Sequence, residues 1–440
     1  MTIDVSHEDE ERIAAQRAEG KLTACERLEI LLDADSFDAL MPARDSDALI
    51  AGSGHANGRQ IFVYARDFTA GKGVISAADA HKLQTLFDTA IQQQVPVVGI
   101  FDGLGIENDP DVLAVLGGVF RRAASASGVA PMISLIAGPC IGADAILANF
   151  SDLIFMSRPA SLFVTGPEVV KALTFEEMTA ADLGGADLHA EKSGIADAIY
   201  YNDIDALLQI RRLIDLLHRD DGWQSFDDPI RSEASLDSLI PEARTQAYDV
   251  KELIGKVLDE GDFFELKERY ARSLVTGFGR LGGHTAGVIA HQPLVLAGVY
   301  DCAALEKAER FLSLCDDFRL PIVSFVDTPG FLPGLAQEQG GIARLAAGLA
   351  RAYAKTHVPK ITVINRNALG ASAIISAAKT LGVDRVFSWP AARIALSGAE
   401  GASDVQNLQT LGVIDAIIEP RDTRRHLIEA LAHMTSAQSR

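Results

Sequence analysis

The feature that most constrains the fold of this chain is an internal repeat. Gly58 precedes Pro96 by 38 residues, and Gly283 precedes Pro321 by the same 38. Each of these prolines opens an apolar run that ends in aspartate, PVVGIFD in the first half and PIVSFVD in the second. Glycine and proline are typical of turns. Their matched positions therefore predict turns, and hence strand ends, at matching places in the two halves. We therefore predict that two distant stretches of the chain fold in the same way.

Further matches follow in the same order along the chain. Pro131 precedes Gly142 by 11 residues, and Pro359 precedes Gly370 by 11. The offset between the two halves changes only from 225 to 228 over these matches. Self-similarity of this kind indicates a duplicated structural unit. We predict two tandem domains, residues 1–225 and 226–440, with an exposed aspartate- and proline-rich linker at residues 218–243.

Strand-like and helix-like stretches alternate within the repeat. Residues 61–64, 97–101 and 132–137 are short apolar runs bounded by Gly, Pro or Asp, which is typical of buried strands. Residues 77–94 carry apolar side chains at helical spacing, and residues 8–32 are expected to form a further helix. The alternation predicts an α/β protein whose central strands are covered on both faces.

Composition and charge exclude several classes of protein. The 440 residues include 60 acidic and 40 basic side chains, which give a formal net charge of −20, and no basic tract interrupts them. Such a chain repels phosphate, so nucleic acid is excluded as a partner. The 4 cysteines are scattered, which argues against a zinc ribbon or a disulfide framework. We expect neither a signal peptide nor a bilayer-spanning stretch, and therefore a soluble cytoplasmic protein.

Familiar nucleophile, nucleotide and metal motifs are missing. The sequence has no P-loop, no dinucleotide fingerprint, no H-E-x-x-H and no G-x-S-x-G. His284 and His291 lie seven residues apart in one predicted strand and so on opposite faces, and we expect no metal site there. Asp102 and Asp327 end equivalent strands. They are either a catalytic pair or, more simply, aspartates that terminate strands and cap the following turns.

Both halves carry a strand that passes through a small-residue turn into a helix-like stretch. The first turn reads GPCIGA at residues 138–143, and the second reads ALGAS at residues 368–372. The first N–H groups of a helix lack partners within the helix and lie at the positive end of its dipole. Such donors suit a developing oxyanion, although glycines here also permit tight packing of helix against strand. Duplication at matching positions favours the oxyanion interpretation.

Several motifs together resemble one known family. They are GPCIGA, LFVTGPEVVK, LGGADLH, VDTPGFLPGLAQEQGG and RNALGAS, and the resemblance extends over about residues 11–420. They are similar to motifs of the carboxyltransferase β subunits of biotin-dependent acyl-CoA carboxylases, of the propionyl-CoA carboxylase type. The resemblance implies two tandem crotonase-like domains, built as ββα spirals. It also implies a homo-oligomer, usually a hexamer, with active sites between the N-terminal domain of one subunit and the C-terminal domain of another.

The resemblance also implies a reaction. A small acyl thioester of the acetyl- or propionyl-CoA class forms an enolate and receives a carboxyl group from carboxybiotin on a carrier protein. Backbone donors at the two turns would hold the charged oxygens. These donors are Gly142 and Ala143 in the first half, and Gly370, Ala371 and Ser372 in the second.

The same resemblance places the pockets around these donors. The biotin and acyl pockets would be lined by Thr165, Gly166, Pro167, Pro329, Gly330, Phe331, Leu332, Pro333 and Gly334. The CoA moiety would be met by Gly105, Arg121, Arg122 and Arg158. The chain has no biotinylation motif and no ATP-binding glycine loop, so we expect the biotin carboxylase and biotin carrier functions on other chains. No metal is implied.

Two departures from the family pattern leave other functions open. Both turns read Gly-Ala where paired glycines are usual, and alanine resists positive φ. Glu107 falls where the family usually has an arginine in its CoA-contacting segment. The chain could therefore instead decarboxylate a malonyl- or methylmalonyl-thioester, on CoA or on an acyl carrier protein, without biotin. It could also be a non-catalytic structural paralogue within a carboxylase complex.

Overall fold

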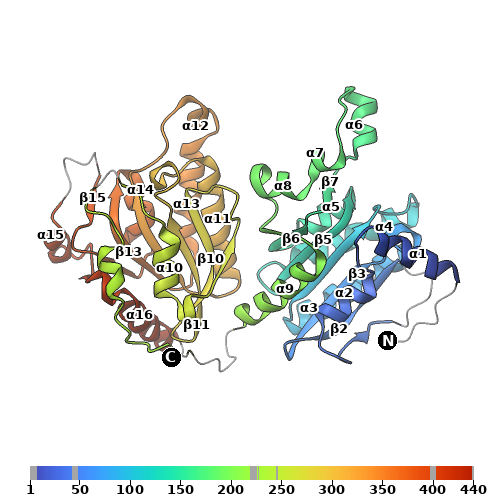
Figure 1. The fold of residues 1–440 in the computed structure, drawn as a ribbon, viewed down its shortest axis with the longest axis horizontal. Coiled ribbons are helices and arrows are strands. Elements are labelled where there is room, and N and C mark those ends of the chain that lie inside the picture. Colours follow the sequence, from blue (N-terminus) through green and yellow to red (C-terminus); the bar gives the residue numbers. More distant parts are fainter. Residues whose placement is uncertain are drawn as a thin grey trace. The chain divides into compact units, whose positions relative to one another are not determined.

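The structure is a computed structural model that describes residues 7–41, 48–218, 225, 227–243, 246–396 and 403–438. The chain forms two compact units, residues 1–215 and 216–440, and each contains one sheet with helices beside it (Figure 1). The domain boundary predicted between residues 225 and 226 stays a prediction, because residues 219–224 and 226 lie outside the described part of the chain.

The first unit is built on a sheet in the order β1-β2-β3-β4-β5-β6-β8, with β7 paired to β5. β2 and β3 form an antiparallel hairpin, and β3 then begins a parallel series through β4, β5, β6 and β8. The strands are β1 (Asp38–Ala39), β2 (Leu49–Ala56), β3 (Arg59–Arg66), β4 (Val97–Gly103), β5 (Met132–Ile141), β6 (Leu153–Ser157), β7 (Ser161–Phe163) and β8 (Ala198–Tyr200).

The second unit has the same plan. Its sheet has the order β9-β10-β11-β12-β13-β14-β16, with β15 paired to β13, and it also begins with antiparallel strands and continues in parallel. The strands are β9 (Phe263–Leu266), β10 (Leu274–Leu281), β11 (His284–His291), β12 (Ile322–Thr328), β13 (Lys360–Leu369), β14 (Arg385–Ser388), β15 (Arg393–Ala395) and β16 (Ala416–Ile417).

Helices connect these strands in both units. Those of the first unit are α1 (His7–Ala18), α2 (Ala24–Leu31), α3 (Ala77–Gln93), α4 (Pro110–Ala126), α5 (Ala143–Ala148), α6 (Pro167–Thr174), α7 (Ala180–Gly184) and α8 (Ala186–Leu188), and α9 (Asp203–Leu217) follows them. Those of the second are α10 (Val250–Val257), α11 (Cys302–Asp317), α12 (Leu335–Gln339), α13 (Ile342–Lys355), α14 (Ala371–Ala377), α15 (Val405–Thr410) and α16 (Thr423–Gln438).

The repeat extends to individual hydrogen bonds. The Ser134 hydroxyl on β5 donates to the Ala148 carbonyl (3.3 Å), and the Thr362 hydroxyl on β13 donates to the Ser376 carbonyl (2.8 Å). At each hairpin, one carboxylate accepts two successive backbone N–H groups. Asp33 takes those of residues 57 and 58, and residues 282 and 283 donate to the carboxylate of residue 259. The predicted α/β fold with two tandem units of the same plan is therefore confirmed.

One predicted element differs from the structure. The helix expected over residues 8–32 is two helices, α1 and α2, separated at Gly20 and Thr23. Gly20 has a φ of 74°, which ends α1, and the Thr23 side chain caps α2 by accepting from the backbone N–H of Glu26. The Glu26 carboxylate accepts from the Thr23 N–H in return, so the pair forms a capping box that fixes the start of α2.

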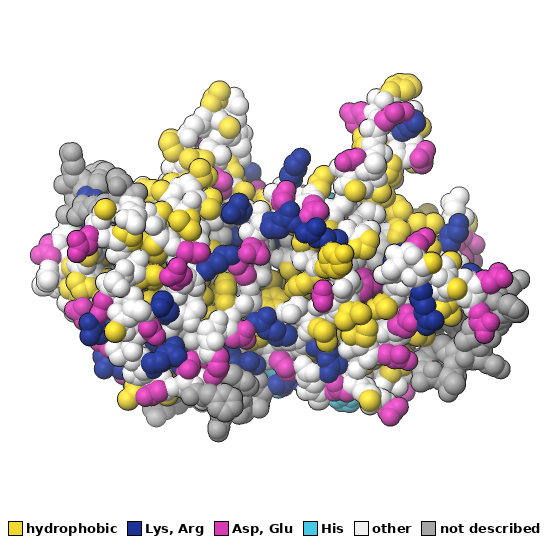
Figure 2. All heavy atoms as spheres, in the orientation of Figure 1, with side chains coloured by type: hydrophobic (Ala, Val, Ile, Leu, Met, Phe, Trp, Pro, Cys, Tyr) yellow, Lys and Arg dark blue, Asp and Glu magenta, His cyan; other side chains and the backbone are white. Residues whose placement is uncertain are grey.

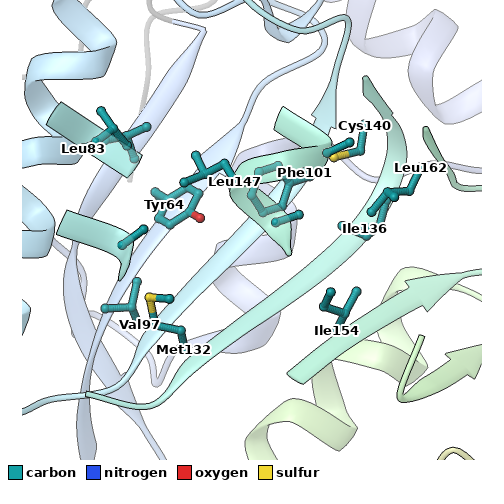
Figure 3. Packing of buried hydrophobic residues seen from close by; sticks show 14 of the residues in the cluster. Tyr64, Leu83, Val97, Phe101, Met132, Ile136, Cys140, Leu147, Ile154 and Leu162 are labelled. Carbon is teal, nitrogen blue, oxygen red and sulfur yellow. The ribbon is translucent and has the colours of Figure 1, made fainter. Parts of the chain in front are cut away.

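The core of the first unit explains why its strands are almost wholly apolar. Side chains from β3, β4 and β5 meet those of α3 and α5, as Figure 3 shows for Tyr64, Leu83, Phe101, Ile136 and Leu147. The rings of Tyr64 and Phe101 pack edge to face, with centroids 5.7 Å apart. This packing anchors the C-terminal ends of β4 and β5, where the predicted functional turn begins.

Candidate active site

The first small-residue turn joins β5 to α5. Gly142 is the N-cap of α5, with φ 66° and ψ −122°, and its own N–H donates to the Phe163 carbonyl (3.1 Å) on β7. Ala143 and Asp144 are the first residues of the helix. Within the described residues, no acceptor takes the N–H of either one. The available donors of this turn therefore begin at Ala143, one residue after the glycine.

The second turn, between β13 and α14, repeats this geometry. Gly370 has φ 70° and ψ −159°, and its N–H donates to the Ala395 carbonyl (2.7 Å) on β15. The N–H groups of Ala371 and Ser372 have no acceptor in the described part of the chain. The Ser372 hydroxyl donates to the Leu369 carbonyl (2.7 Å), so this residue contributes its backbone rather than its side chain.

The expected conflict between alanine and positive φ does not arise. The left-handed conformation falls on Gly142 and Gly370, whereas Ala143 and Ala371 are the first helical residues, and neither has a positive φ. The combination of angles at Gly370 is almost exclusive to glycine. Alanine in the next position keeps its N–H and its direction. The Gly-Ala sequence therefore does not weaken either turn as a donor.

An exposed isoleucine follows each set of donors on the same short helix. Ile146 on α5 is 43 % exposed, and Ile374, at the matching position of α14, is 47 % exposed. Both lie on helices whose other apolar side chains are largely buried. We expect an exposed isoleucine so near the turn to exclude water from it, which would strengthen hydrogen bonds to a developing charge. Sequence reasoning missed this pair, although the repeat aligns the two positions.

Two other predicted segments lie next to the first turn. Gly105, with φ 95°, follows β4, and a Cβ added to it would lie 3.4 Å from the Ile141 carbonyl oxygen. Residues 165–167 follow β7, the strand that accepts the Gly142 N–H, after one intervening residue. Of these, Thr165 is exposed, Gly166 caps α6 and Pro167 begins it. Gly105 and the segment that leads into residues 165–167 thus both lie next to the first turn.

The loop over residues 329–334 lies beside the second turn. Phe331 pairs with Tyr300 in a parallel bridge, and their ring centroids are 6.0 Å apart. The Gly330 carbonyl accepts from the Tyr300 N–H (3.0 Å), and the Tyr300 hydroxyl lies 3.0 Å from that of Ser376. Pro329, Pro333 and Gly334 are exposed, while Leu332 is half-buried. Tyr300 was not singled out from the sequence, but it anchors this loop.

The same bridge occurs in the first unit. Ile75 pairs with Ile106, its N–H donates to the Gly105 carbonyl (3.0 Å), and its own carbonyl accepts from the Glu107 N–H (2.9 Å). Gly105 is therefore the structural counterpart of Gly330. The Glu107 side chain is exposed, and only its backbone takes part in the bridge.

A buried ion pair distinguishes the first turn from the second. The guanidinium of Arg66, at the end of β3, pairs with the carboxylate of Asp144 in the first turn of α5. Arg66 and Asp144 are only 1 % and 2 % exposed. Burial raises the pKa of Asp144 to about 6, against the opposing effect of Arg66. Sequence reasoning missed this pair, although the repeat sets Arg66 opposite His291 and Asp144 opposite Ser372.

Uncharged groups occupy the matching place in the second unit. His291 is 2 % exposed and packs edge to face on Tyr300, with centroids 4.8 Å apart. Burial lowers the pKa of His291 to about 4, so the ring is neutral near pH 7. His284 lies exposed at the opposite end of the same strand. Among the described residues, no group of three or more His, Cys, Asp or Glu side chains is placed to hold a metal ion.

The predicted CoA-contacting arginines are spread over two elements. Arg121 and Arg122 lie on α4, where Arg121 is exposed and the Arg122 Nε lies 2.8 Å from an Asp88 carboxylate oxygen. Arg158 is exposed just after β6. No described contact joins these arginines to the first turn, so their role in binding CoA stays a prediction.

Asp102 and Asp327 occupy equivalent strand ends but are held by different partners. Asp102 is fully buried and accepts from Arg27 (2.9 Å), Lys21 (2.9 Å) and Gln16 (2.8 Å). Asp327 accepts from Arg366 (2.9 Å) and from the side chain of Asn367 (2.9 Å). Both carboxylates have several hydrogen-bond partners within the protein. This favours the interpretation that they end strands and hold neighbouring segments, rather than forming a catalytic pair.

Comparison with protein families places most of the chain in one of them. The family model described as carboxyl transferase domain matches residues 15–411. The propionyl-CoA carboxylase beta chain of Roseobacter denitrificans is 40 % identical over 97 % of this chain and 93 % of its own length. The methylmalonyl-CoA decarboxylase subunit alpha of Veillonella parvula is 38 % identical over 97 % of this chain and 92 % of its own.

A solved structure has the same fold, which confirms the predicted tandem crotonase-like units. Transcarboxylase 12S, described as a hexamer with methylmalonyl-coenzyme A and methylmalonic acid bound, superposes with a TM-score of 0.93. The two sequences are 33 % identical, and the match covers 97 % of this chain and 92 % of that one. None of the described helices is both long and apolar enough to cross a membrane.

The buried carboxylate of Asp102 provides a first prediction. Asp102→Ala removes one of the two carboxylates that pair with the fully buried Arg27, the other being Asp203, and we expect the free energy of unfolding to fall by about 1.5–3 kcal/mol. Asp88→Ala removes an exposed partner of Arg122 and is the control, with an expected change below about 1 kcal/mol. Denaturant unfolding measures both. An Asp102→Ala protein of unchanged stability that has lost activity would instead support the catalytic interpretation.

The raised pKa of Asp144 provides a second prediction. The folded protein holds this proton more tightly than the unfolded chain, so the contribution of Asp144 to stability grows as pH falls from about 6 towards its unfolded value of 3.8. Relative to Asp144→Asn, wild type should gain about 2–3 kcal/mol of unfolding free energy between pH 7 and pH 4. Parallel pH profiles of unfolding for the two proteins would contradict the raised pKa.

Proposed function

This chain belongs to the carboxyl transferase domain family, and on that basis we propose that it moves a carboxyl group between carboxybiotin on a carrier protein and the α-carbon of a small acyl-CoA. The observation that carries the proposal is the duplicated turn, in which a glycine at positive φ releases the next N–H groups at the end of a central strand. Two such donor sets suit a reaction in which two reactants develop negative charge on oxygen.

The first turn is assigned to the acyl thioester. As the α-proton leaves, charge develops on the thioester oxygen, and the N–H groups of Ala143 and Asp144 are free to donate to it. The Asp144 carboxylate would oppose that charge if it stood alone. Its pairing with Arg66 offsets the repulsion and holds the first turn of α5 in place. Gly105 and residues 165–167 then border the space beside the donors.

The second turn is assigned to the ureido oxygen of biotin. Carboxybiotin, when bound, supplies the activated carboxyl group. The residues present fit such a group, because Ala371 and Ser372 have free N–H donors and the loop over residues 329–334 presents Phe331 and exposed prolines beside them. His291, which matches Arg66 in the repeat, is neutral near pH 7 and adds no charge.

Partners follow from the same assignment. We propose that the biotin carboxylase and biotin carrier functions reside on other chains, and that this chain forms a homo-oligomer, as the hexameric transcarboxylase 12S does. Supporting this, α6 has no buried residue, and its segment exposes Val169, Leu173 and Phe175. Figure 2 shows the projecting segment that contains α6 with both hydrophobic and charged side chains on its surface. The cytoplasmic location predicted from the sequence remains part of the proposal.

The relative named methylmalonyl-CoA decarboxylase subunit alpha supports a second candidate function. The same donor sets would stabilise the enolate left when a malonyl- or methylmalonyl-thioester loses its carboxyl group. The thioester could be carried by CoA or by an acyl carrier protein. The alternative of a non-catalytic structural paralogue rested on the Gly-Ala turns and on Glu107. The first of these no longer supports it, because the alanines are helical and keep their N–H donors.

A label-transfer assay tests the proposal directly. We expect the chain to move ¹⁴C from a carboxylated biotin carrier protein to propionyl- or acetyl-CoA, with acid-stable product detected by chromatography. The same protein incubated with methylmalonyl-CoA and no biotin should leave the thioester unchanged by mass spectrometry. Loss of carbon dioxide in that second mixture, without transfer in the first, would favour the biotin-independent decarboxylase.

A proline substitution tests the donor assignment. Ala371 is the first residue of α14, a position that proline tolerates well, so Ala371→Pro should delete one N–H and preserve the fold. Losing one oxyanion donor costs about 2.7–4 kcal/mol, and kcat for carboxyl transfer should therefore fall by about 10²–10³. Ala371→Ser keeps the N–H and is the matched control. If both variants retained full activity while remaining folded, the second turn would not be the donor site.

A further inference from the structure

A cavity of about 600 Å³ lies within the second unit. Four segments far apart in the sequence line it: residues 236–242, the end of β13, the turn from β14 to β15, and the start of the 3-10 helix Pro420–Asp422. Among its described lining residues, none belongs to the second oxyanion turn or to residues 329–334. Its volume falls in the range of small-molecule sites.

A buried amide with one unused oxygen forms part of the wall. Asn365 is 2 % exposed, its Nδ2 donates to the Tyr248 hydroxyl, and that hydroxyl is hydrogen-bonded to the Asp327 carboxylate. A carboxylate only accepts, and a tyrosine hydroxyl has one proton, so Tyr248 donates to Asp327 and accepts from Asn365. The Asn365 amide therefore cannot be reversed. Its Oδ1 is buried and has no partner among the described groups.

A second amide oxygen lies two residues further along β13. The backbone N–H and the Nδ2 of Asn367 both donate to Asp327, at 3.2 and 2.9 Å, which leaves Oδ1 as the remaining polar atom of this side chain. Residues i and i+2 of a strand share one face, and Asn365 and Asn367 both line the cavity. The end of β13 therefore has two amide oxygens that can accept a hydrogen bond. Asp327 holds the Asn367 side chain directly and that of Asn365 through Tyr248.

The charged groups around the cavity also favour a ligand that donates hydrogen bonds. The lining guanidinium of Arg366 is paired with Asp327 and also donates to the Gln246 carbonyl (2.9 Å). The Asp237 carboxylate is paired with Arg421. Arg393 lines the cavity from β15, and the exposed Glu242 and Glu419 add two carboxylates. The apolar part of the lining consists of Leu236, Ile240, Pro241, Trp389, Pro390 and Pro420.

We propose that this cavity binds a small molecule with an apolar body that ends in a planar N–H donor group, such as a primary carboxamide, a ureide or an amidine. The donor group bonds to Oδ1 of Asn365 and of Asn367, and the body packs against Trp389 and its apolar neighbours. A buried acceptor without a partner is costly, so a ligand that supplies an N–H gains affinity from this atom. The site does not depend on the proposed carboxyl transfer.

The test uses the full chain with benzamide, phenylurea and benzamidine as probes, and N,N-dimethylbenzamide as the probe that lacks an N–H. Isothermal calorimetry measures binding. We expect at least one N–H probe to bind saturably, and the dimethyl compound to bind at least tenfold more weakly than benzamide. Asn365→Leu should weaken binding of the N–H probe about tenfold, because the probe loses its hydrogen-bond partner.

A second variant guards against effects on folding. Ala391 is exposed at the rim, so Ala391→Trp should fill the cavity and abolish binding without disturbing Asn365. Ala354→Trp, on the exposed face of α13, is the matched control and should bind the probe normally. The proposal is overturned if none of the N–H probes binds saturably, if N,N-dimethylbenzamide binds as well as benzamide, or if Ala391→Trp leaves binding unchanged.

Discussion

One glycine at positive φ, placed where the central strand of each unit turns into a short helix, sets the geometry on which the site depends. Gly142 and Gly370 each donate their own N–H to a short neighbouring strand, which ties the turn to the sheet. The chain then enters the helix with its next N–H groups free of partners. Because the donors belong to the backbone, their direction depends on the fold and not on side-chain identity, so alanine can follow the glycine.

The two turns have similar backbone conformations but differ in the side chains at two matching positions. The first rests on the buried pair Arg66–Asp144, whereas the second has neutral His291 and Ser372 at the matching positions. A carboxylate so close to a developing oxyanion needs a compensating cation, and the guanidinium of Arg66 provides one. This asymmetry supports the assignment of the turns to different reactants. It also shows how a duplicated unit can specialise at a single layer of side chains.

The architecture could be predicted from the sequence more completely than the chemistry of the site. Spacing of glycines and prolines predicted the duplication, because these residues act locally and mark strand ends in both halves. It did not predict the break at Gly20, since a single glycine is compatible with both a helix and its end. The Arg66–Asp144 pair joins residues 78 apart in the chain, and the Asn365–Tyr248–Asp327 chain also depends on tertiary contact. Contacts between residues so far apart in the chain leave no pattern in the local sequence.

The most direct test of the central claim separates the two donor sets. Loss of label from a carboxylated carrier protein in the absence of acyl-CoA involves only the second turn, while transfer to propionyl-CoA involves both. Ala371→Pro should therefore slow both processes, and Ala143→Pro should slow transfer alone by about 10²–10³. If Ala143→Pro slowed the loss of label as strongly as Ala371→Pro, the two turns would not serve separate reactants, and the assignment would be wrong.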